Sequence, residues 1–308
     1  MEIKTFNHDP NFSIVMRGGC NAQCGFCFNK DKKGKDVAAS GGEWLFGLYD
    51  ALCQLPGKFY QISITGNEPM LSADIENVMA MCKKLKGRYT NILLTTNGTN
   101  LLNRIDCVSS GVHHINVSRH HYDEEENKRI FGGSYNVMDS ELMEIVDRYS
   151  AIGIDVSLNC VIDDTTTFDF VLQFVDFAKR VGANAVRFRK KNGDNLGLTP
   201  CEMCVSKNYP ILSKGECPVC RTYLRVIGGL KTYWKASLVE PTQVVSNEVY
   251  ELVYNTDGKL YLDWGYSIPF DLVFLSTKSR VVFEGANDER ELIRSMTADC
   301  GTYRSSHC

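Results

Sequence analysis

The sequence predicts an α/β fold: a partial (β/α)6 TIM-like barrel over residues 1–192, followed by a small cysteine-rich, β-containing lobe over residues 193–308. Short runs rich in Val, Ile and Thr alternate with longer segments whose apolar residues recur at helical spacing. Six such units in succession indicate parallel strands joined by right-handed crossovers, which curl into complete or partial barrels. The chain of 308 residues is long enough for this domain and an appendage.

Six runs that are too short for helices are the predicted strands. In chain order they are 13–17, 60–66, 91–96, 113–118, 155–162 and 184–189. Amphipathic segments lie between them. In 139–153, Leu142, Ile145 and Val146 recur at helical spacing before a glycine, and 168–182 has a similar pattern.

Composition restricts the class of protein. A net charge of −3 gives no overall attraction to nucleic acid or to an anionic membrane. No run approaches the roughly 18 apolar residues of a membrane span, and the polar start "MEIKTFNHDP" is no signal peptide. We therefore expect a cytoplasmic protein without a membrane partner. Thirteen cysteines in such a protein indicate metal binding more than disulfides.

Motifs typical of binding sites stand where the predicted strands end. In chain order they are the cysteine triplet of residues 20–27, "GNEP" at 66–69, "TTNG" at 95–98, "SRHH" at 118–121 and Asn159. Since sites in barrels of this kind lie at the carboxyl ends of the strands, we expect these motifs to meet there.

The triplet has the spacing Cys-x3-Cys-x2-Cys, formed by Cys20, Cys24 and Cys27. A cubane iron–sulfur cluster has four irons, and cysteine thiolate is the usual protein ligand of each. Three cysteines leave one iron open to chelate a small molecule through an amine and a carboxylate. The alternative is a zinc knuckle that takes its fourth ligand from elsewhere in the chain.

The spacing, with Phe26 just before the last cysteine, resembles that of the radical S-adenosylmethionine (SAM) superfamily, and the resemblance extends over residues 12 to about 190. It implies that the triplet binds a [4Fe-4S] cluster, that the open iron holds the methionine moiety of SAM and that Phe26 packs on the adenine. It also implies reductive cleavage of SAM to a 5′-deoxyadenosyl radical, which abstracts hydrogen from a substrate.

Gly66, Asn67, Glu68 and Pro69 resemble the "GGEP" loop of the superfamily, with Asn67 in place of the second glycine. The resemblance implies that this loop binds the SAM amino group through its backbone. A contact from main-chain atoms tolerates the change to Asn, provided that Asn67 adopts the backbone angles that the loop requires.

Within the superfamily, "TTNG", "INVS", "SLNCVI" and "VRFR" are most similar to the molybdopterin-precursor cyclase group. This likeness implies that Thr96, Ser118, Arg119 and Asn159 line the SAM ribose and carboxylate, and Asn97 is grouped with these cofactor-binding residues. The planar fork of donors on Arg119 suits a carboxylate. The alternative for Arg119 is an ordinary surface arginine.

Arg119, His120 and His121 are the predicted catalytic residues, because they end the fourth strand. A histidine at this place is able to donate a proton or to bind substrate. The alternative for both histidines is a solvated loop position.

The predicted C-terminal lobe holds two Cys-x2-Cys pairs, Cys201 with Cys204 and Cys217 with Cys220. This pattern predicts a four-cysteine metal site, for which we favour structural zinc. The alternative is a second [4Fe-4S] cluster. The segment 220–234 resembles the hairpin that follows an auxiliary-cluster pair in the molybdopterin-precursor enzymes, but Trp234 stands where that group places its third cysteine.

The predicted substrate is a small molecule or a nucleotide, because four basic residues leave the sixth strand where a phosphate could enter. They are Arg187, Arg189, Lys190 and Lys191. A low-potential donor such as flavodoxin or ferredoxin is the expected electron source. Two alternatives remain: a maturase acting on a peptide or protein side chain, and a non-catalytic cysteine-rich zinc protein that binds nucleic acid.

Overall fold

The computed structural model describes most of the chain. The described residues are 9–29, 41–55, 59–85, 87, 89–133, 135, 137–191, 197–215, 222–236, 244–245 and 248–270. Within these ranges, no helix has both the length and the apolar character needed to cross a membrane.

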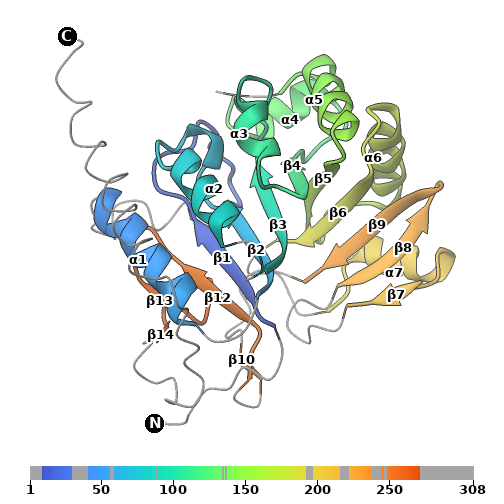
Figure 1. Cartoon of the computed structure of the whole chain (residues 1–308). Coiled ribbons are helices and arrows are strands. Elements are labelled where there is room, and N and C mark those ends of the chain that lie inside the picture. The colour runs from blue at the N-terminus through green and yellow to red at the C-terminus, as the bar shows by residue number, and fades with distance from the viewer. Residues whose placement is uncertain are drawn as a thin grey trace.

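Twelve strands of the described residues form one curved sheet in the order β14-β13-β12-β1-β2-β3-β4-β5-β6-β9-β8-β7 (Figure 1). Their bounds are β1 Asn11–Val15, β2 Phe59–Thr65, β3 Tyr89–Thr96, β4 His114–Ser118, β5 Asp155–Ile162, β6 Ala185–Lys190, β7 Ser213–Lys214, β8 Tyr223–Ile227, β9 Leu230–Lys235, β12 Glu251–Tyr254, β13 Leu260–Tyr261 and β14 Pro269–Phe270. Two further short strands, β10 (Val244–Val245) and β11 (Glu248–Val249), pair only with each other.

Helices follow the strands of the barrel. Their bounds are α1 Gly41–Gln54, α2 Ile75–Lys84, α3 Ile105–Ser109, α4 Glu124–Ile130, α5 Asp139–Ala151, α6 Phe168–Arg180 and α7 Pro200–Asn208. Helices α1 to α6 lie along the outer side of the curved sheet (Figure 1). Helix α6 illustrates how such a helix begins and packs on the sheet. Thr167 caps its first turn by accepting a hydrogen bond from the Phe170 amide, and Phe174 and Phe177 are buried on one of its faces.

The eight neighbouring strands from β12 to β9 pair in parallel, and this confirms the predicted partial TIM-like barrel. All six predicted strands are present, and their ends differ from the prediction by at most two residues. The first strand begins earlier than predicted because polar Asn11 pairs with both Gln61 and Glu251. Periodicity of apolar residues gives no signal for such a polar end.

The strands after residue 193 extend the barrel sheet at both of its edges. Strand β9 pairs in parallel with β6, and β12 pairs in parallel with β1. The hairpin expected within 220–234 is present as β8–β9. A second hairpin, β12–β13, is closed by Gly258, whose amide donates to the Asn255 carbonyl. These C-terminal strands therefore share one sheet with the barrel, and the predicted division into two domains stays a prediction.

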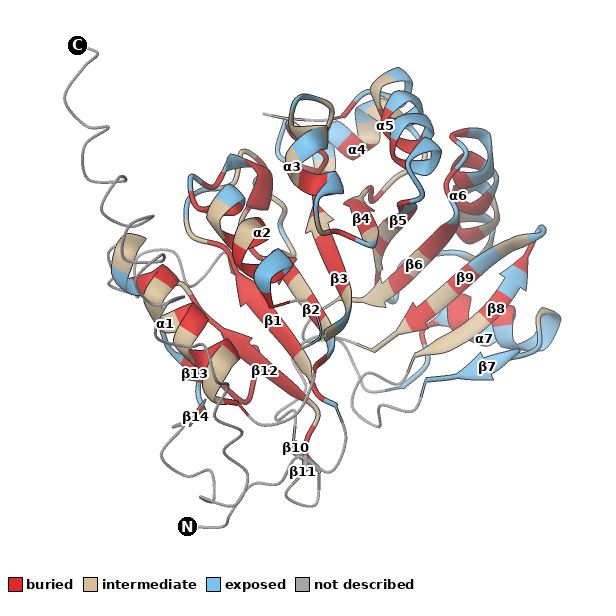
Figure 2. Cartoon of the chain, in the orientation of Figure 1, coloured by how far each residue is buried: buried red, intermediate tan, exposed pale blue. Residues whose placement is uncertain are grey.

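The barrel strands carry apolar residues toward the helices and polar residues toward the interior. On β1, Phe12 and Ile14 belong to the hydrophobic core, whereas Ser13 lines the interior. On β2, Ser63 and Thr65 likewise face inward. Figure 2 shows an alternation of buried and partly exposed residues along β2, whereas β1 is buried almost throughout. Since TIM barrels usually fill their interior with bulky apolar side chains, this polar interior indicates a cavity for a polar ligand.

Candidate functional site

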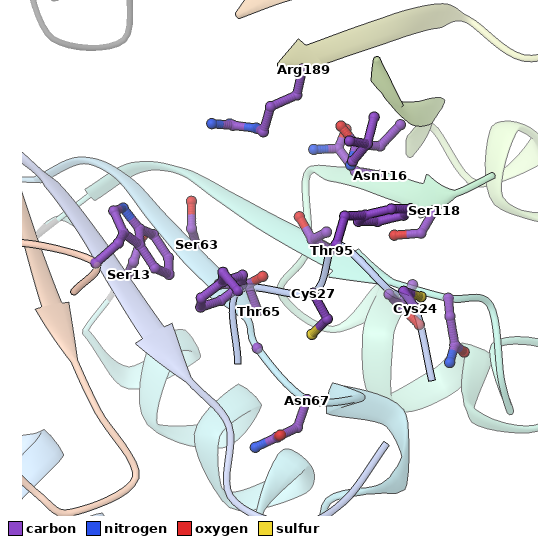
Figure 3. Close-up of a pocket in the computed structure, with 18 of the residues that line it drawn as sticks. Ser13, Cys24, Cys27, Ser63, Thr65, Asn67, Thr95, Asn116, Ser118 and Arg189 are labelled. Carbon is purple, nitrogen blue, oxygen red and sulfur yellow. The ribbon is translucent and has the colours of Figure 1, made fainter. Parts of the chain in front are cut away.

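One cavity runs from the ends of the parallel strands into the barrel, and most of the predicted site residues line it. These residues are Cys20, Cys24, Phe26, Cys27, Gly66, Asn67, Glu68, Thr96, Asn97, Ser118, His120 and Asn159. Figure 3 shows Cys24 and Cys27 beside Asn67, Thr95 and Ser118, with Arg189 across the same space. The predicted meeting of motifs from five different strands is therefore present.

The cysteine triplet follows β1 as an irregular segment, and all three side chains are partly buried. The Ala22 amide donates to Cys20 Sγ at 3.4 Å, and the Asn97 side-chain amide lies 3.9 Å from the same sulfur. Such N–H donors stabilise a thiolate, which is the form that binds metal. The triplet thus has the chemistry that a metal centre requires.

The described residues hold no group of three Cys, His, Asp or Glu side chains close enough together to ligate a single metal ion. This spacing suits a cubane better than a zinc knuckle, because each thiolate of a cubane binds a different iron. Three thiols that line one cavity therefore fit a [4Fe-4S] cluster, of which Cys20, Cys24 and Cys27 would bind three irons.

The loop after β2 depends on two unusual backbone conformations. Gly66 has a φ of 74°, and a Cβ added to it would lie 2.5 Å from Val15 Cγ1. Asn67 has a φ of 48°, and its side-chain amide donates to the Met16 carbonyl at 2.8 Å. Asn is among the few residues with a side chain that tolerate this region. Asn67 thus fills the position of the second glycine without distorting the loop.

Glu68 connects this loop to the end of β3. Its carboxylate accepts hydrogen bonds from Thr96 Oγ1 at 2.5 Å, from the Asn97 amide at 2.6 Å and from the Met70 amide at 3.0 Å. Burial raises the pKa of Glu68 to about 7, against the effect of these three hydrogen bonds. The side chain of Glu68 therefore fixes the relative position of two cavity-lining loops.

His120 lies in the cavity wall as a neutral side chain. Its ring contacts Phe26 edge-on, with centroids 4.7 Å apart, and Nδ1 accepts a hydrogen bond from the Val161 amide at 3.2 Å. Complete burial, followed by the charge of Arg119, lowers the pKa of His120 to about 3. The imidazole then carries its proton on Nε2, and its ring packs against Phe26 in the wall.

Arg119, His121 and Pro69 lie outside the lining of the cavity. The Arg119 guanidinium donates to the carbonyls of His121 and Val137 and to the Asp139 carboxylate, and it lies over the Phe177 ring. The guanidinium therefore contacts groups of the protein itself, and the predicted contact with the SAM carboxylate stays a prediction. The alternative of a surface arginine is wrong, since Arg119 is 2% exposed.

His121 accepts a hydrogen bond from the Asp123 amide and stacks near Tyr122 and Phe170. His121 therefore contacts the turn that leads into α4. The neighbouring pair His120 and His121 point to different surroundings because successive side chains after a strand diverge.

The cavity also contains residues that were not among the predicted site residues. They are mainly polar side chains on the inward faces of the strands: Asn11, Ser13, Gln61, Ser63, Thr65, Thr95, Asn116, Lys235 and Glu251, with Trp264. The period-2 alternation of polar and apolar residues in β1 and β2 was a signal for some of them. Lys235 and Glu251 gave no such signal, since only the sheet order brings β9 and β12 to the barrel.

The four basic residues near the end of β6 have different surroundings. Arg189, Lys190 and Lys191 line the cavity, whereas Arg187 lies over the Tyr233 ring and contacts His114. Lys190 pairs with Glu202 at 3.2 Å, and Lys191 lies 3.9 Å from Asp163.

Cys201 and Cys204 lie on α7, which begins with a capping box formed by Thr199 and Glu202. Cys201 is buried, and its sulfur lies 3.2 Å from Thr199 Oγ1, whereas Cys204 is exposed. Cys217 and Cys220 fall outside the described residues. The predicted four-cysteine site therefore stays a prediction.

Comparisons with known proteins agree with this geometry. The family model of the radical SAM superfamily matches residues 14–178. The GTP 3',8-cyclase of Aquifex aeolicus (strain VF5) is 32% identical over 176 residues, which are 55% of this chain and 52% of that protein. The GTP 3',8-cyclase of Staphylococcus aureus (strain Mu3 / ATCC 700698) is 26% identical over 196 residues, 61% of this chain and 56% of that protein. The chain thus spans about half the length of the curated relatives it matches.

Solved structures show a similar fold over more of the chain. Native anSMEcpe with bound AdoMet and Cp18Cys peptide is 15% identical, with a TM-score of 0.56, over 96% of this chain and 86% of that one. Streptococcus suis SuiB bound to precursor peptide SuiA is 15% identical, with a TM-score of 0.57, over 92% of this chain and 66% of that one. Since the family model spans more than half of the chain and the cysteine triplet lines the cavity, the protein belongs to the radical SAM superfamily.

Proposed function

We propose that this enzyme abstracts a hydrogen atom from an anionic small molecule or nucleotide that binds in the barrel cavity. The observation that carries the proposal is that the cysteine triplet, the 66–68 loop and the basic residues Arg189 and Lys235 line one cavity. When bound, the cluster and SAM supply a 5′-deoxyadenosyl radical. The protein's part is to orient SAM, exclude water and hold one C–H bond of the substrate near it.

Each group of cavity residues has a proposed role. Cys20, Cys24 and Cys27 would hold three irons of the cluster, and Phe26 would pack on adenine. The backbone of the 66–68 loop would bind the SAM amino group, as its resemblance to the "GGEP" loop implies, and all three of its residues line the cavity. The hydroxyls and amides at the strand ends would bind the ribose and the carboxylate; they are Thr96, Asn97, Ser118 and Asn159.

The charge of the cavity supports an anionic substrate. Four basic residues line it, against the two carboxyl groups of Glu68 and Glu251. Since cations in a partly desolvated cleft attract phosphate and carboxylate strongly, a nucleoside triphosphate is the first candidate. The named substrate of the GTP 3',8-cyclase relatives supports the same choice. We also propose that the enzyme works in the cytoplasm with a low-potential electron donor.

Mutation of the triplet tests the radical SAM chemistry. Cys24→Ala should lose the cluster and make no 5′-deoxyadenosine from SAM with dithionite under anaerobic conditions. Cys107→Ala is the matched control, because Cys107 is also partly buried but lies outside the cavity lining. Formation of 5′-deoxyadenosine by Cys24→Ala would contradict the assignment of the triplet. Faster formation with GTP than without it would support the substrate class.

A peptide or protein side chain is the second candidate substrate. The observation that favours it is the fold likeness to anSMEcpe and SuiB, which includes the C-terminal strands, whereas the GTP 3',8-cyclases match only 55% to 61% of the chain. Stimulation of SAM cleavage by a peptide encoded beside this protein, but by no nucleotide, would favour this candidate. Because the chain belongs to the radical SAM superfamily, we no longer retain the alternative of a non-catalytic zinc protein.

A further inference from the structure

The cavity has a charged region that the C-terminal strands build. Glu251 stands at the start of β12 and Lys235 at the end of β9, and both line the cavity with Arg189 of β6. Glu251 is only 8% exposed, and Ser13 Oγ donates to its Oε1 at 2.6 Å. A carboxyl group is thus held in one orientation beside the basic residues of the cavity.

The electrostatic surroundings of Glu251 combine opposite effects. Burial is the largest effect and raises the pKa of the carboxyl above its ordinary value, while the Ser13 hydrogen bond, the Trp264 indole and the charges of Arg189 and Lys235 oppose this rise. A carboxylate has about four lone-pair positions for hydrogen bonds, and Ser13 and Trp264 leave some of them for a ligand. Glu251 therefore has the capacity to accept further hydrogen bonds from a ligand in the cavity.

A purely anionic ligand would be repelled by Glu251 while it is attracted by Arg189 and Lys235. A ligand that carries a hydrogen-bond donor beside its anionic group would satisfy all three side chains. Building on the proposed function, we propose that Glu251 is a specificity-determining residue: it binds an N–H or hydroxyl group of the substrate, while Arg189 and Lys235 bind the neighbouring phosphate or carboxylate. The substrate class is therefore an anion with a donor group, such as a nucleotide, rather than a simple polyanion.

Two probes distinguish these classes by calorimetric titration of the reconstituted enzyme with SAM. GTP carries donor groups on its ribose and base, whereas inorganic triphosphate carries the anion alone. Glu251→Gln should weaken GTP binding by about 10- to 100-fold, as expected for loss of a hydrogen bond to a charged group. Its affinity for triphosphate should stay within about twofold or increase, because the repelling charge is gone. Glu125→Gln, at an exposed position of α4, should change neither affinity.

Ser13→Ala gives a second variant in case Glu251→Gln folds poorly. It leaves the carboxylate in place without its hydrogen bond, and we expect a smaller loss for GTP, about three- to tenfold, with triphosphate unaffected. Equal changes for both probes, unchanged GTP affinity in both variants, or no binding of GTP to the wild-type enzyme would overturn the proposal. The proposed radical chemistry is tested separately. It is contradicted if the wild-type enzyme makes no 5′-deoxyadenosine, whatever the binding measurements show.

Discussion

Arg119 Nη2 lies 2.7 Å from Asp139 Oδ1, which ties the end of β4 to the first turn of α5. The Arg119 side chain is 2% exposed, whereas that of Asp139 is 37% exposed. The same guanidinium also donates to two backbone carbonyls. Arg119 therefore holds the end of β4 against α5. If this is its main role, replacing Arg119 should lower stability more than it lowers SAM affinity.

Arg119→Ala should lower the free energy of unfolding by about 3 kcal/mol, because buried carbonyls lose their donor and Phe177 loses its cation. Asp139→Asn should cost about 1 kcal/mol or less, since water screens that partly exposed carboxylate. Urea unfolding measures both, and SAM affinity of the folded variants should stay near the wild-type value. A large loss of SAM affinity without loss of stability would instead support the predicted SAM contact.

The 66–68 loop gives a prediction about backbone shape. Gly66→Ala should destabilise the protein by about 2 to 4 kcal/mol and weaken SAM binding at least tenfold, because the new methyl group would overlap Val15 and the φ is positive. Asn67→Gly should cost about 1 kcal/mol or less, since it loses only the bond to Met16 and glycine accepts a φ of 48°. Titration with SAM measures the difference. Equal effects of the two changes would argue against recognition by the backbone.

The sequence predicted the strands and the cysteine-rich end of the cavity well, because both depend on local patterns. Apolar runs fix the strands, and the triplet lies within one short segment. The placement of Arg119 could not be predicted, since two of the groups that accept hydrogen bonds from its guanidinium, the Val137 carbonyl and the Asp139 carboxylate, lie 18 and 20 residues further along the chain. Glu251 was missed for a similar reason: β12 joins β1 across 238 residues, and no local pattern signals that pairing.

The neutral state of His120 predicts a pH dependence of stability. Its folded pKa of about 3 lies below its ordinary value of 6.5, so between these pH values the unfolded chain binds more protons than the native one. Stability should therefore rise with pH through this window and be lost as the pH falls below about 6.5. At pH 5 the wild-type protein should have lost about 2 kcal/mol through this group.

His120→Asn is the variant to compare, because its side-chain oxygen can still accept a hydrogen bond from Val161 and has no such titration. Anaerobic urea unfolding at pH 7 and pH 5 should show a drop that is about 2 kcal/mol larger for the wild-type protein than for the variant. Parallel losses in the two proteins would mean that His120 is protonated in the native state.

The paired cysteines of the C-terminal part give the last prediction. If Cys201, Cys204, Cys217 and Cys220 hold zinc, as we expect, anaerobically reconstituted protein should contain about one zinc and about four irons per chain. A second cubane would raise the iron to about eight and leave zinc near background.

Cys204→Ala is the informative variant, because Cys204 is exposed and its loss removes no core packing, unlike that of buried Cys201. With zinc, this variant should lose the zinc and stability, since metal-binding free energy contributes to folding, and keep its iron absorbance. With a cluster it should lose about half of that absorbance. Four titratable thiols and neither metal in the wild-type protein would refute both assignments.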